Sequence, residues 1–282
     1  MMSNFRTLDD LGDVTGKVAL VRVDLNLPMN GGSVTDTTRV QAAAPTILEL
    51  ADAGAKVLLL AHFGRPKGER NSTMSVSMTL DAVEDVLGRE VMFIPEVQGP
   101  VVEQSIGILR NGDIGLLENT RFWAGEEAND ADFAKGIAAH GDFYVNDAFS
   151  AAHRAHASTH GIAKLLPAYA GRAMEKELRA LESALENPEQ PVAAVVGGAK
   201  VSSKLAVLEK YLADTQLQDL YFCAFKRVPD LPRVAHAANH PRYRRSAGRL
   251  PLQTTLPQAQ LDPPQTALQS HPRRTTGWPT PR

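Results

Sequence analysis

Short runs of apolar, mostly β-branched residues alternate through residues 1–213 with longer stretches in which apolar residues recur every three or four positions. The short runs predict strands and the longer stretches predict amphipathic helices. The predicted strands are Val18–Val23, Lys56–Ala61, Glu90–Ile94, Asp113–Leu117, Phe143–Val145 and Val192–Val196. The predicted helices are Val40–Ala53, Leu80–Leu87, Val101–Leu109, Asp130–His140, Arg172–Leu185 and Val201–Leu212. Nearly all-apolar strands joined by helices predict an α/β fold, with a Rossmann-like parallel sheet and helices on both faces.

The composition changes near residue 213. Residues 214–282 hold ten of the 18 prolines, nine arginines and seven glutamines, but no isoleucine or glutamate. Their ten basic and four acidic residues give a charge of +6, whereas the 20 basic and 28 acidic residues of 1–213 give −8. A proline-rich segment with little apolar content is typical of disorder. We therefore predict a disordered Pro/Arg/Gln-rich tail over residues 214–282.

The net charge, the length of the apolar runs and the cysteine count exclude several classes of protein. A net charge of −2 favours neither nucleic acid nor membrane as the main partner. Apolar runs such as Val57–Ala61 are too short to span a bilayer, and the N-terminus lacks a signal-peptide pattern. The single cysteine, Cys223, excludes an internal disulfide framework and fits a reducing compartment. We expect a cytoplasmic globular protein.

Polar residues follow four of the predicted strands. In a parallel sheet, ligands bind beyond the carboxyl ends of the strands, so these residues are the candidates for a site. They are Asp24, Asn26 and Arg39, then His62 and Arg65, then Arg121, and finally His153, Arg154 and His156. One arginine alone is typically a solvated surface charge, but four at one sheet edge would repel each other without an anion. Because guanidinium groups match phosphate and carboxylate oxygens, the pattern predicts an anion site.

The histidines allow two readings, a hydrogen-bonded structural imidazole or a ligand contact. No Cys/His or His/carboxylate spacing indicates a zinc site, so we predict no metal ligands. A second feature, Gly197-Gly198-Ala199-Lys200 with Lys204 beyond it, lies between a predicted strand and a helix. Phosphate can approach backbone N–H groups at such a turn, although Gly-Gly is often only tight packing. The spacing is neither Walker A nor the dinucleotide fingerprint.

Together these motifs closely resemble the phosphoglycerate kinase family from about residue 5 to residue 212. The stretches that carry the resemblance are Val21–Pro28, Thr35–Arg39, His62–Gly68, Leu117–Phe122, Val145–Phe149, Ala152–Ser158 and Gly197–Lys204. Phe63, where leucine is more usual, and Asn71–Met78 depart from the family pattern without removing a candidate ligand group.

The resemblance implies reversible phosphoryl transfer in glycolysis between ATP and the carboxylate of 3-phosphoglycerate. It implies a monomer with two Rossmann-like domains joined by a hinge. The residues implied to bind 3-phosphoglycerate and 1,3-bisphosphoglycerate are Asp24, Asn26, Arg39, His62, Arg65, Arg121 and Arg154. Arg39 would also act in catalysis, and Lys200 and Lys204 would bind Mg-ATP or Mg-ADP. The implied parts are a substrate domain over residues 1–171, a hinge helix over 172–190 and the start of a nucleotide domain over 191–213.

The resemblance stops where the tail begins, before most of the expected nucleotide domain. We therefore expect an inactive, truncated kinase, and the alternative is a non-catalytic 3-phosphoglycerate-binding fragment. The tail suggests a shifted reading frame or a misassembled gene. In another reading, its basic residues Arg242–Arg245 and Arg273-Arg274 make the chain a basic-tailed binding protein for nucleic acid or anionic surfaces.

Overall fold

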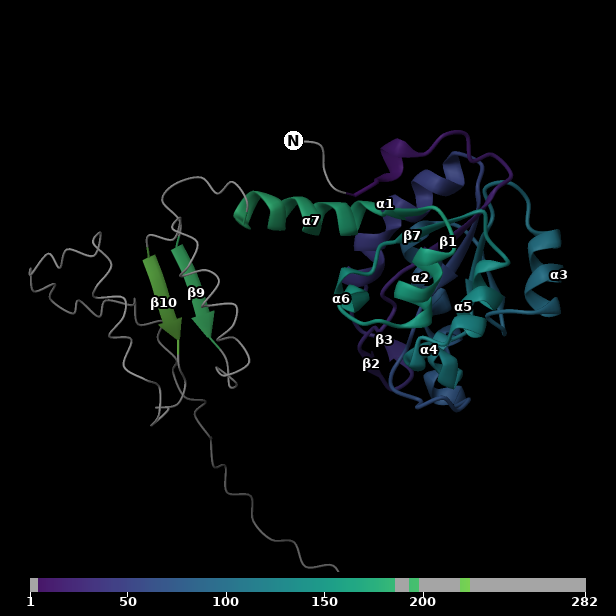
Figure 1. Ribbon diagram of the computed structural model, residues 1–282. Helices are drawn as coiled ribbons and strands as arrows, with labels where there is room; N and C mark the ends of the chain where they lie inside the picture. The colour runs from purple at the N-terminus through teal and green to yellow at the C-terminus, as the bar shows by residue number, and fades with distance from the viewer. Residues whose placement is uncertain (1–4, 186–192, 198–218, 224–282) are drawn as a thin grey trace, which may run out of the picture. The chain divides into compact units, whose positions relative to one another are not determined.

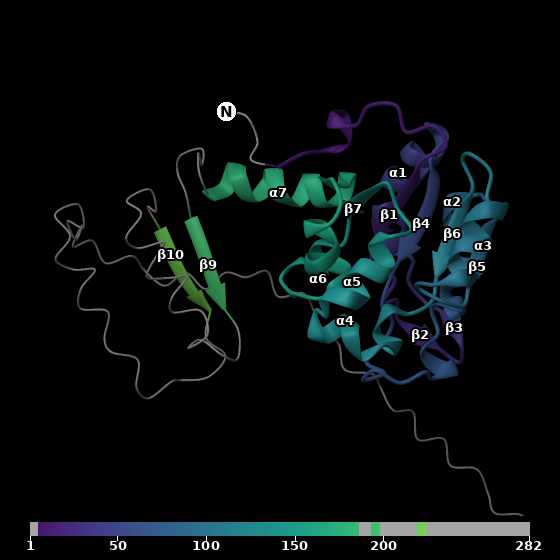
Figure 2. The same cartoon turned by 45° about the vertical axis from the view of Figure 1, so that its right-hand side comes forward.

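The computed structural model describes residues 5–185, 193–197 and 219–223 (Figure 1). Its main sheet is six-stranded, in the order β5-β6-β4-β1-β7-β8. The strands are β1 (Val18–Arg22), β4 (Lys56–Leu60), β5 (Val91–Ile94), β6 (Ile114–Leu117), β7 (Phe143–Asn146) and β8 (Ala168–Ala170). Every neighbouring pair is parallel, which confirms the predicted fold class. Figure 2 shows β7, β1, β4, β6 and β5 in this order across the sheet.

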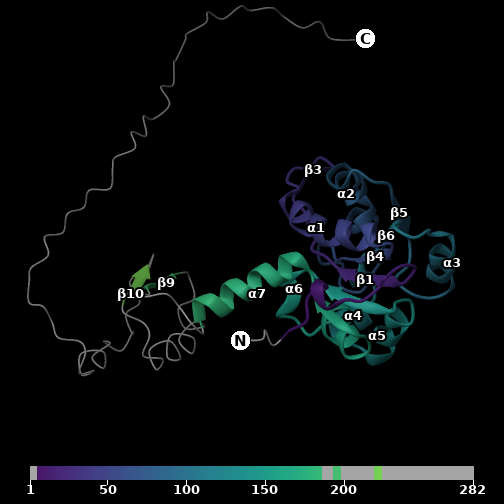
Figure 3. The same ribbon diagram turned by 90° about the horizontal axis from the view of Figure 1, so that it is seen from above.

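Helices cover both faces of the sheet. They are α1 (Thr38–Asp52), α2 (Leu80–Leu87), α3 (Pro100–Ile108), α4 (Ala124–Ala128), α5 (Ala131–Ala138), α6 (Phe149–Ala152) and α7 (Arg172–Leu185). Single-turn helices occur at η1 (Leu8–Asp10), η2 (Ser72–Met74), η3 (Val76–Thr79), η4 (Thr120–Phe122), η5 (Ala157–Gly161) and η6 (Ile162–Lys164). Seen from above in Figure 3, α1 and α2 lie on one side of the sheet and α4 and α5 on the other.

Alternation along each strand builds two cores. In β1, Ala19 and Val21 join the core beneath α1 and α2, whereas Val18 and Leu20 join the opposite core with α5. Successive strand side chains point to opposite faces, so a strand covered on both sides must be apolar throughout. Arg22 ends β1 on the Val18–Leu20 face and is 1% exposed, so it is a buried charge inside an apolar run.

The strands and longer helices lie close to their predicted places, and α2 and α7 coincide with the prediction. Several short elements were not predicted, among them three strands. Strand β8 is an edge strand of three residues, and the strands β2 (Met29–Asn30) and β3 (Ser33–Val34) pair across the Gly31-Gly32 turn. Gly31 and Gly32 both have positive φ, which explains why glycines occupy the turn. Segments this short leave too little periodicity for a sequence pattern to reveal.

The start of α7 is attached to the sheet and to α1. Asp147, which follows β7, accepts hydrogen bonds from the backbone N–H groups of Ala173 and Met174 at 2.8 and 3.1 Å. Arg172 forms ion pairs with Glu49 on α1 and with Asp9, both at 2.6 Å. A carboxylate at a helix N-terminus satisfies N–H groups that have no partner within the helix. The helix that we expected to be a hinge is therefore anchored at its first turn.

Two further strands, β9 (Ala193–Gly197) and β10 (Asp219–Cys223), form a separate two-stranded sheet. Strand β10 lies within residues 214–282, the range predicted as a tail. The predicted helix Val201–Leu212, together with Lys200 and Lys204, lies outside the described residues. Of the helices that the structure describes, none combines the length and the apolar character needed to cross a membrane.

Candidate anion-binding site

Four adjacent strands, β6, β4, β1 and β7, end at one edge of the sheet. Because these strands are parallel, the loops that follow them carry the candidate residues to the same edge. The chain also reverses its direction of winding here, since β1 pairs with β4 on one side and with β7 on the other. Such a switch point is where open α/β sheets form a crevice for ligands.

Arg39, at the start of α1, is held by the loop after β1. Its Nη1 atom donates to both carboxylate oxygens of Asp24 at 3.1 and 3.0 Å and to the Asn26 carbonyl at 2.9 Å. Ser150, in α6 after β7, donates to the same Asp24 carboxylate at 2.5 Å. The Arg39 side chain remains 48% exposed. The contacts orient the guanidinium group without burying it, so part of it is open to a ligand.

Buried amide groups join the loops that follow β4 and β6. The Asn119 side chain is fully buried, accepts from the Phe63 N–H at 3.2 Å and donates to the Phe63 carbonyl at 2.7 Å. The Gly64 N–H donates to the side-chain oxygen of Asn26 at 2.9 Å, and the Gly64 carbonyl accepts from Arg121 Nη1 at 3.0 Å. Gly64 has a φ of 62° and therefore occupies the left-handed region that favours glycine. Three loops are thus joined at a single glycine.

Arg121 is 4% exposed, and its Nε atom lies 3.2 Å from a Glu127 carboxylate oxygen, without the geometry of a hydrogen bond. Burial lowers the pKa of Arg121, with Glu127 opposing the shift and Arg154 adding to it. The guanidinium group is thus a desolvated cation whose acidic neighbours are the partly exposed Glu127 and, with a weaker effect, the buried Glu126. A second anion beside it would lower its energy.

His62 follows β4 and is 7% exposed. Its Nδ1 atom lies 2.7 Å from Nη2 of Arg22, the buried arginine at the end of β1. The pKa of His62 is lowered to about 2, mainly by burial. The charges of Arg22, Arg121 and Arg154 contribute to the same shift. The ring is therefore neutral at pH 7, and three cations act on it together.

Arg65 and Arg154 are the last two of the seven candidate residues. Arg65 is exposed, and within residues 5–185 the structure gives its side chain no hydrogen bond or ion pair. Arg154 is half-buried, and its Nε atom donates weakly to His153 Nε2 at 3.4 Å. His153 itself is exposed. These two arginines keep most of their donors free, which is what bidentate recognition of a phosphate or carboxylate requires.

The structure thus places all seven residues expected to contact substrate at one edge of the sheet, linked through Asp24, Gly64 and the electrostatic contacts around His62. Sequence reasoning missed the residues beneath them, Arg22, Ser158 and Glu126. Arg22 carried a usable signal, because it is the one charge in an otherwise apolar strand. Glu126 and Ser158 carried none. In the described residues no group of three or more Cys, His, Asp or Glu side chains suits a metal ion.

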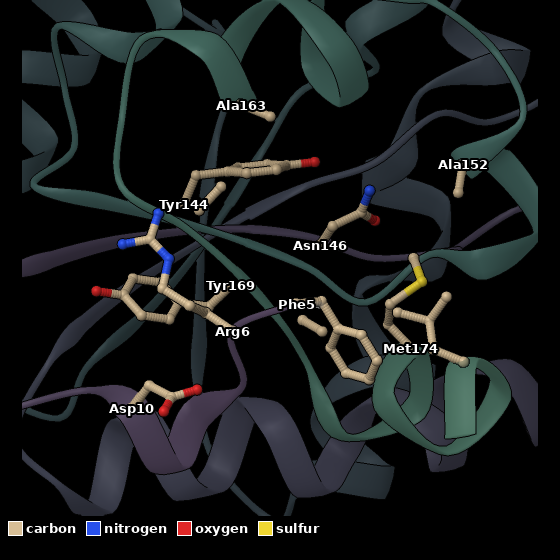
Figure 4. Close-up of a pocket in the computed structure, with 12 residues that line it drawn as sticks. Phe5, Arg6, Asp10, Tyr144, Asn146, Ala152, Ala163, Tyr169 and Met174 are labelled. Carbon is tan, nitrogen blue, oxygen red and sulfur yellow. The ribbon is translucent and has the colours of Figure 1, made fainter. Parts of the chain in front are cut away.

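A separate pocket of about 860 Å³ lies beside β7, β8 and α7 (Figure 4). It is lined by Phe5, Arg6, Asp10, Tyr144, Asn146, Ala152, Ala163, Ala168, Tyr169, Ala170, Met174 and Leu178. In the close-up, Phe5, Tyr144 and Tyr169 contribute aromatic rings to the lining, and Arg6, Asp10 and Asn146 contribute polar side chains. None of the seven candidate residues lines this pocket, so it is distinct from the arginine-rich edge.

The fold and the site define a Rossmann-like α/β protein with an arginine-rich site at the carboxyl edge of its sheet. A family model described as phosphoglycerate kinase matches residues 8–220. The chain therefore belongs to the phosphoglycerate kinase family.

Curated relatives agree with this assignment. The phosphoglycerate kinase of Sphingopyxis alaskensis is 67% identical over 207 residues, which are 73% of this chain and 52% of the relative. That of Zymomonas mobilis is 63% identical over 204 residues, 72% of this chain and 51% of the relative. The chain thus spans about half the length of the curated relatives that it matches.

Solved structures support the same family assignment. The phosphoglycerate kinase of Coxiella burnetii superposes with a TM-score of 0.70 at 36% identity, covering 77% of this chain and 54% of that one. The crystal structure of the enzyme from Pyrococcus horikoshii gives a TM-score of 0.69 at 32% identity, covering 78% and 55%.

Proposed function

We propose that the carboxyl edge of the sheet binds 3-phosphoglycerate, through Asp24, Asn26, Arg39, His62, Arg65, Arg121 and Arg154. The observation that carries the proposal is that Arg39, Arg65, Arg121 and Arg154 all follow adjacent parallel strands at one edge of the sheet, with Arg121 and Arg154 acting on the neutral His62. Asp24 and Glu127 are the acidic partners of Arg39 and Arg121. The ligand suits this site because it carries a phosphate and a carboxylate, two anions that match guanidinium groups.

The family reaction, in our proposal, is reversible phosphoryl transfer between ATP and the carboxylate of this ligand. That carboxylate is ionised at neutral pH, so the reaction needs no general base. Catalysis then consists of positioning and charge neutralisation. Arg39 is the residue we assign to the transferred group, because it is both oriented by Asp24 and about half exposed. Closure of two domains about α7 would exclude water from the aligned substrates.

The nucleotide side of the reaction is assigned to Lys200 and Lys204, which lie outside the described residues. Mg-ATP or Mg-ADP would supply the phosphoryl group and the metal ion. Because the match covers about half of each relative, we propose 3-phosphoglycerate binding without turnover as the function of this chain. We further propose a cytoplasmic monomer that does not use nucleic acid as a partner.

Calorimetric titration of the 282-residue chain with 3-phosphoglycerate tests the proposal. We expect saturable binding that weakens as salt is added, because the contacts are ionic. Glycerate, which has the same carboxylate but no phosphate, is the ligand control and should bind far more weakly. A titration that shows no binding of 3-phosphoglycerate would overturn the proposal.

A coupled ATP-dependent kinase assay distinguishes a chain that binds 3-phosphoglycerate without turnover from one that also catalyses phosphoryl transfer. Binding without turnover supports a substrate-binding chain. Sustained turnover by this chain would instead make it a complete kinase and would refute the claim that the unmatched half of the relatives is needed.

A further inference from the structure

We infer that Arg22 is a positioning residue of the candidate anion site, holding the His62 ring in the tautomer that presents its Nε2–H group to the ligand. It does so as part of a buried quartet formed by Glu126, Ser158, Arg22 and His62. The role in ligand binding rests on the proposed function, whereas the choice of tautomer does not.

The first step is that the protein itself occupies every part of the Arg22 guanidinium group. Arg22 is 1% exposed. Its Nε atom donates to the Ser158 hydroxyl at 3.0 Å, Nη1 donates to the Val23 carbonyl, and Nη2 lies 2.7 Å from His62 Nδ1. An arginine held in this way acts on a ligand through its neighbours.

The second step fixes the tautomer. A guanidinium group has donors only, so in the contact between Arg22 Nη2 and His62 Nδ1 the imidazole nitrogen must accept. A neutral imidazole has one protonated nitrogen, and with Nδ1 as acceptor the proton is on Nε2. No described residue hydrogen-bonds His62 Nε2, and this atom is not among the buried polar atoms that lack a partner. Nε2–H therefore lies where the ring reaches the surface of the site.

The third step explains why Arg22 can remain charged at this depth. Glu126 is fully buried and accepts from the backbone N–H of Ser158 at 2.9 Å and from its hydroxyl at 2.6 Å. The Ser158 hydroxyl thus donates to Glu126 and accepts from Arg22, so one oxygen connects a buried anion to a buried cation. Pairing of this kind is what allows charges to be retained in an apolar interior.

The consequence for the site is electrostatic. The opposite tautomer would turn an unprotonated ring nitrogen, with its lone pair, towards an anionic ligand oxygen. With Nδ1 engaged by Arg22, the neutral ring can offer only a donor. Arg121 and Arg154 lie near enough to act on the same ring, so the donor joins the cations that face the ligand.

The tautomer can be measured without ligand by long-range ¹H–¹⁵N spectroscopy of the imidazole-labelled full chain at pH 7. His140 is an internal reference, because its Nε2 atom accepts from the Gly99 N–H at 3.0 Å and its proton must lie on Nδ1. We expect His62 as the Nε2–H tautomer and His140 as the Nδ1–H tautomer. An Nδ1–H or doubly protonated His62 would overturn the inference, whether or not the chain binds 3-phosphoglycerate.

A matched pair of variants tests the link to binding. The amide nitrogen of glutamine in His62→Gln can occupy the place of Nε2, whereas in His62→Asn the amide lies nearer the place of Nδ1. We expect His62→Gln to stay within about 3-fold of the wild-type affinity for 3-phosphoglycerate and His62→Asn to lose about 10-fold or more. Equal losses, or a smaller loss in His62→Asn, would refute a donor at Nε2.

The role of Arg22 itself is tested by Arg22→Met, which keeps the length of the side chain and removes the donor. Where the folded variant is recovered, His62 should become a mixture of tautomers while His140 keeps its spectrum. A His62 that remains wholly in the Nε2–H form would show that Arg22 does not set the tautomer. If Arg22→Met does not fold, the wild-type spectrum and the His62 pair still decide the inference.

Discussion

The arginines at the carboxyl edge of the sheet form a deep pair and an outer set. Arg22 and Arg121 are 1% and 4% exposed and donate to backbone carbonyls, a hydroxyl and an imidazole. Arg39, Arg65 and Arg154 are exposed or half-buried, and only Arg39 has a carboxylate partner among the described residues. The same residue type thus has two uses at one edge, because burial determines whether its donors meet the protein or remain open to a ligand.

This difference affects stability as well as binding. A deep cation is desolvated, so its partners must compensate it in every state of the folded protein. An outer cation remains hydrated and contributes little to stability, but it can exchange water for a ligand oxygen. Substitutions should therefore separate the two sets, the deep ones by unfolding and the outer ones by loss of affinity.

The largest effect is expected for Arg22→Met. Removing the cation takes away the charge that Ser158 connects to the buried Glu126 and leaves only the weaker influence of Arg121 and His156. We expect this to cost about 3–5 kcal/mol in the free energy of unfolding. Arg39→Met removes an exposed ion pair and should cost less than about 1 kcal/mol. Urea unfolding of both variants measures the contrast, and equal losses would show that depth does not separate the two sets.

Arg39→Ala should mainly affect binding. Losing a charged donor to the ligand should weaken the affinity for 3-phosphoglycerate by about 1.5–3 kcal/mol, or roughly 10- to 100-fold. Arg89→Ala is the matched control, because Arg89 forms a similar exposed ion pair with Asp52 but precedes β5, at the opposite edge of the sheet. Calorimetry should find the control unchanged, and an unaltered affinity in Arg39→Ala would remove Arg39 from the site.

Acid should destabilise the folded protein through His62, which contacts the buried Arg22. Because burial and Arg22 lower the pKa of His62 to about 2, only the unfolded state takes up this proton as the pH falls below about 6.5. Stability should therefore fall with falling pH by up to about 1.4 kcal/mol per unit from His62 alone, between pH 6.5 and 2. Urea unfolding at pH 7 and 5.5 should show a smaller loss in His62→Gln than in the wild type. His160→Gln, which replaces an exposed histidine, should keep the wild-type slope.

The smallest change in stability is expected at Arg65. Its side chain has no hydrogen bond or ion pair within residues 5–185, so Arg65→Ala should alter the free energy of unfolding by no more than about 0.5 kcal/mol. Its affinity for 3-phosphoglycerate should nevertheless fall, because the free guanidinium group is a candidate ligand contact. A destabilised variant with unchanged affinity would move Arg65 from the outer set to a structural role.

Most of the fold could be predicted from local patterns. Strands β1 and β4 are nearly continuous apolar runs, and helices α2 and α7 repeat an apolar period over eight or more residues; both patterns persist in the folded chain. The edge strand β8 could not be found in this way. It has three residues, and its pairing with β7 depends on a neighbour 24 residues earlier in the chain, as in the pair Tyr144–Ala168.

The four arginines proposed to contact the ligand were also accessible to the sequence. Arg39, Arg65, Arg121 and Arg154 each follow an apolar strand, and the geometry of parallel sheets brings the ends of such strands together. The contacts among the buried residues beneath them were not accessible. Glu126 meets Ser158 across 32 positions and Arg22 meets Ser158 across 136, so no local spacing connects them.

The sequence by itself therefore determined the alternation of strands and helices, the edge at which polar residues gather, and the family. These properties follow from periodicity and from motifs read along the chain. Only the tertiary structure decided which arginines are buried, which histidine nitrogen must accept, and which acid compensates the deepest cation. Those depend on distances and desolvation between residues remote in sequence, and such properties arise only once the chain has folded.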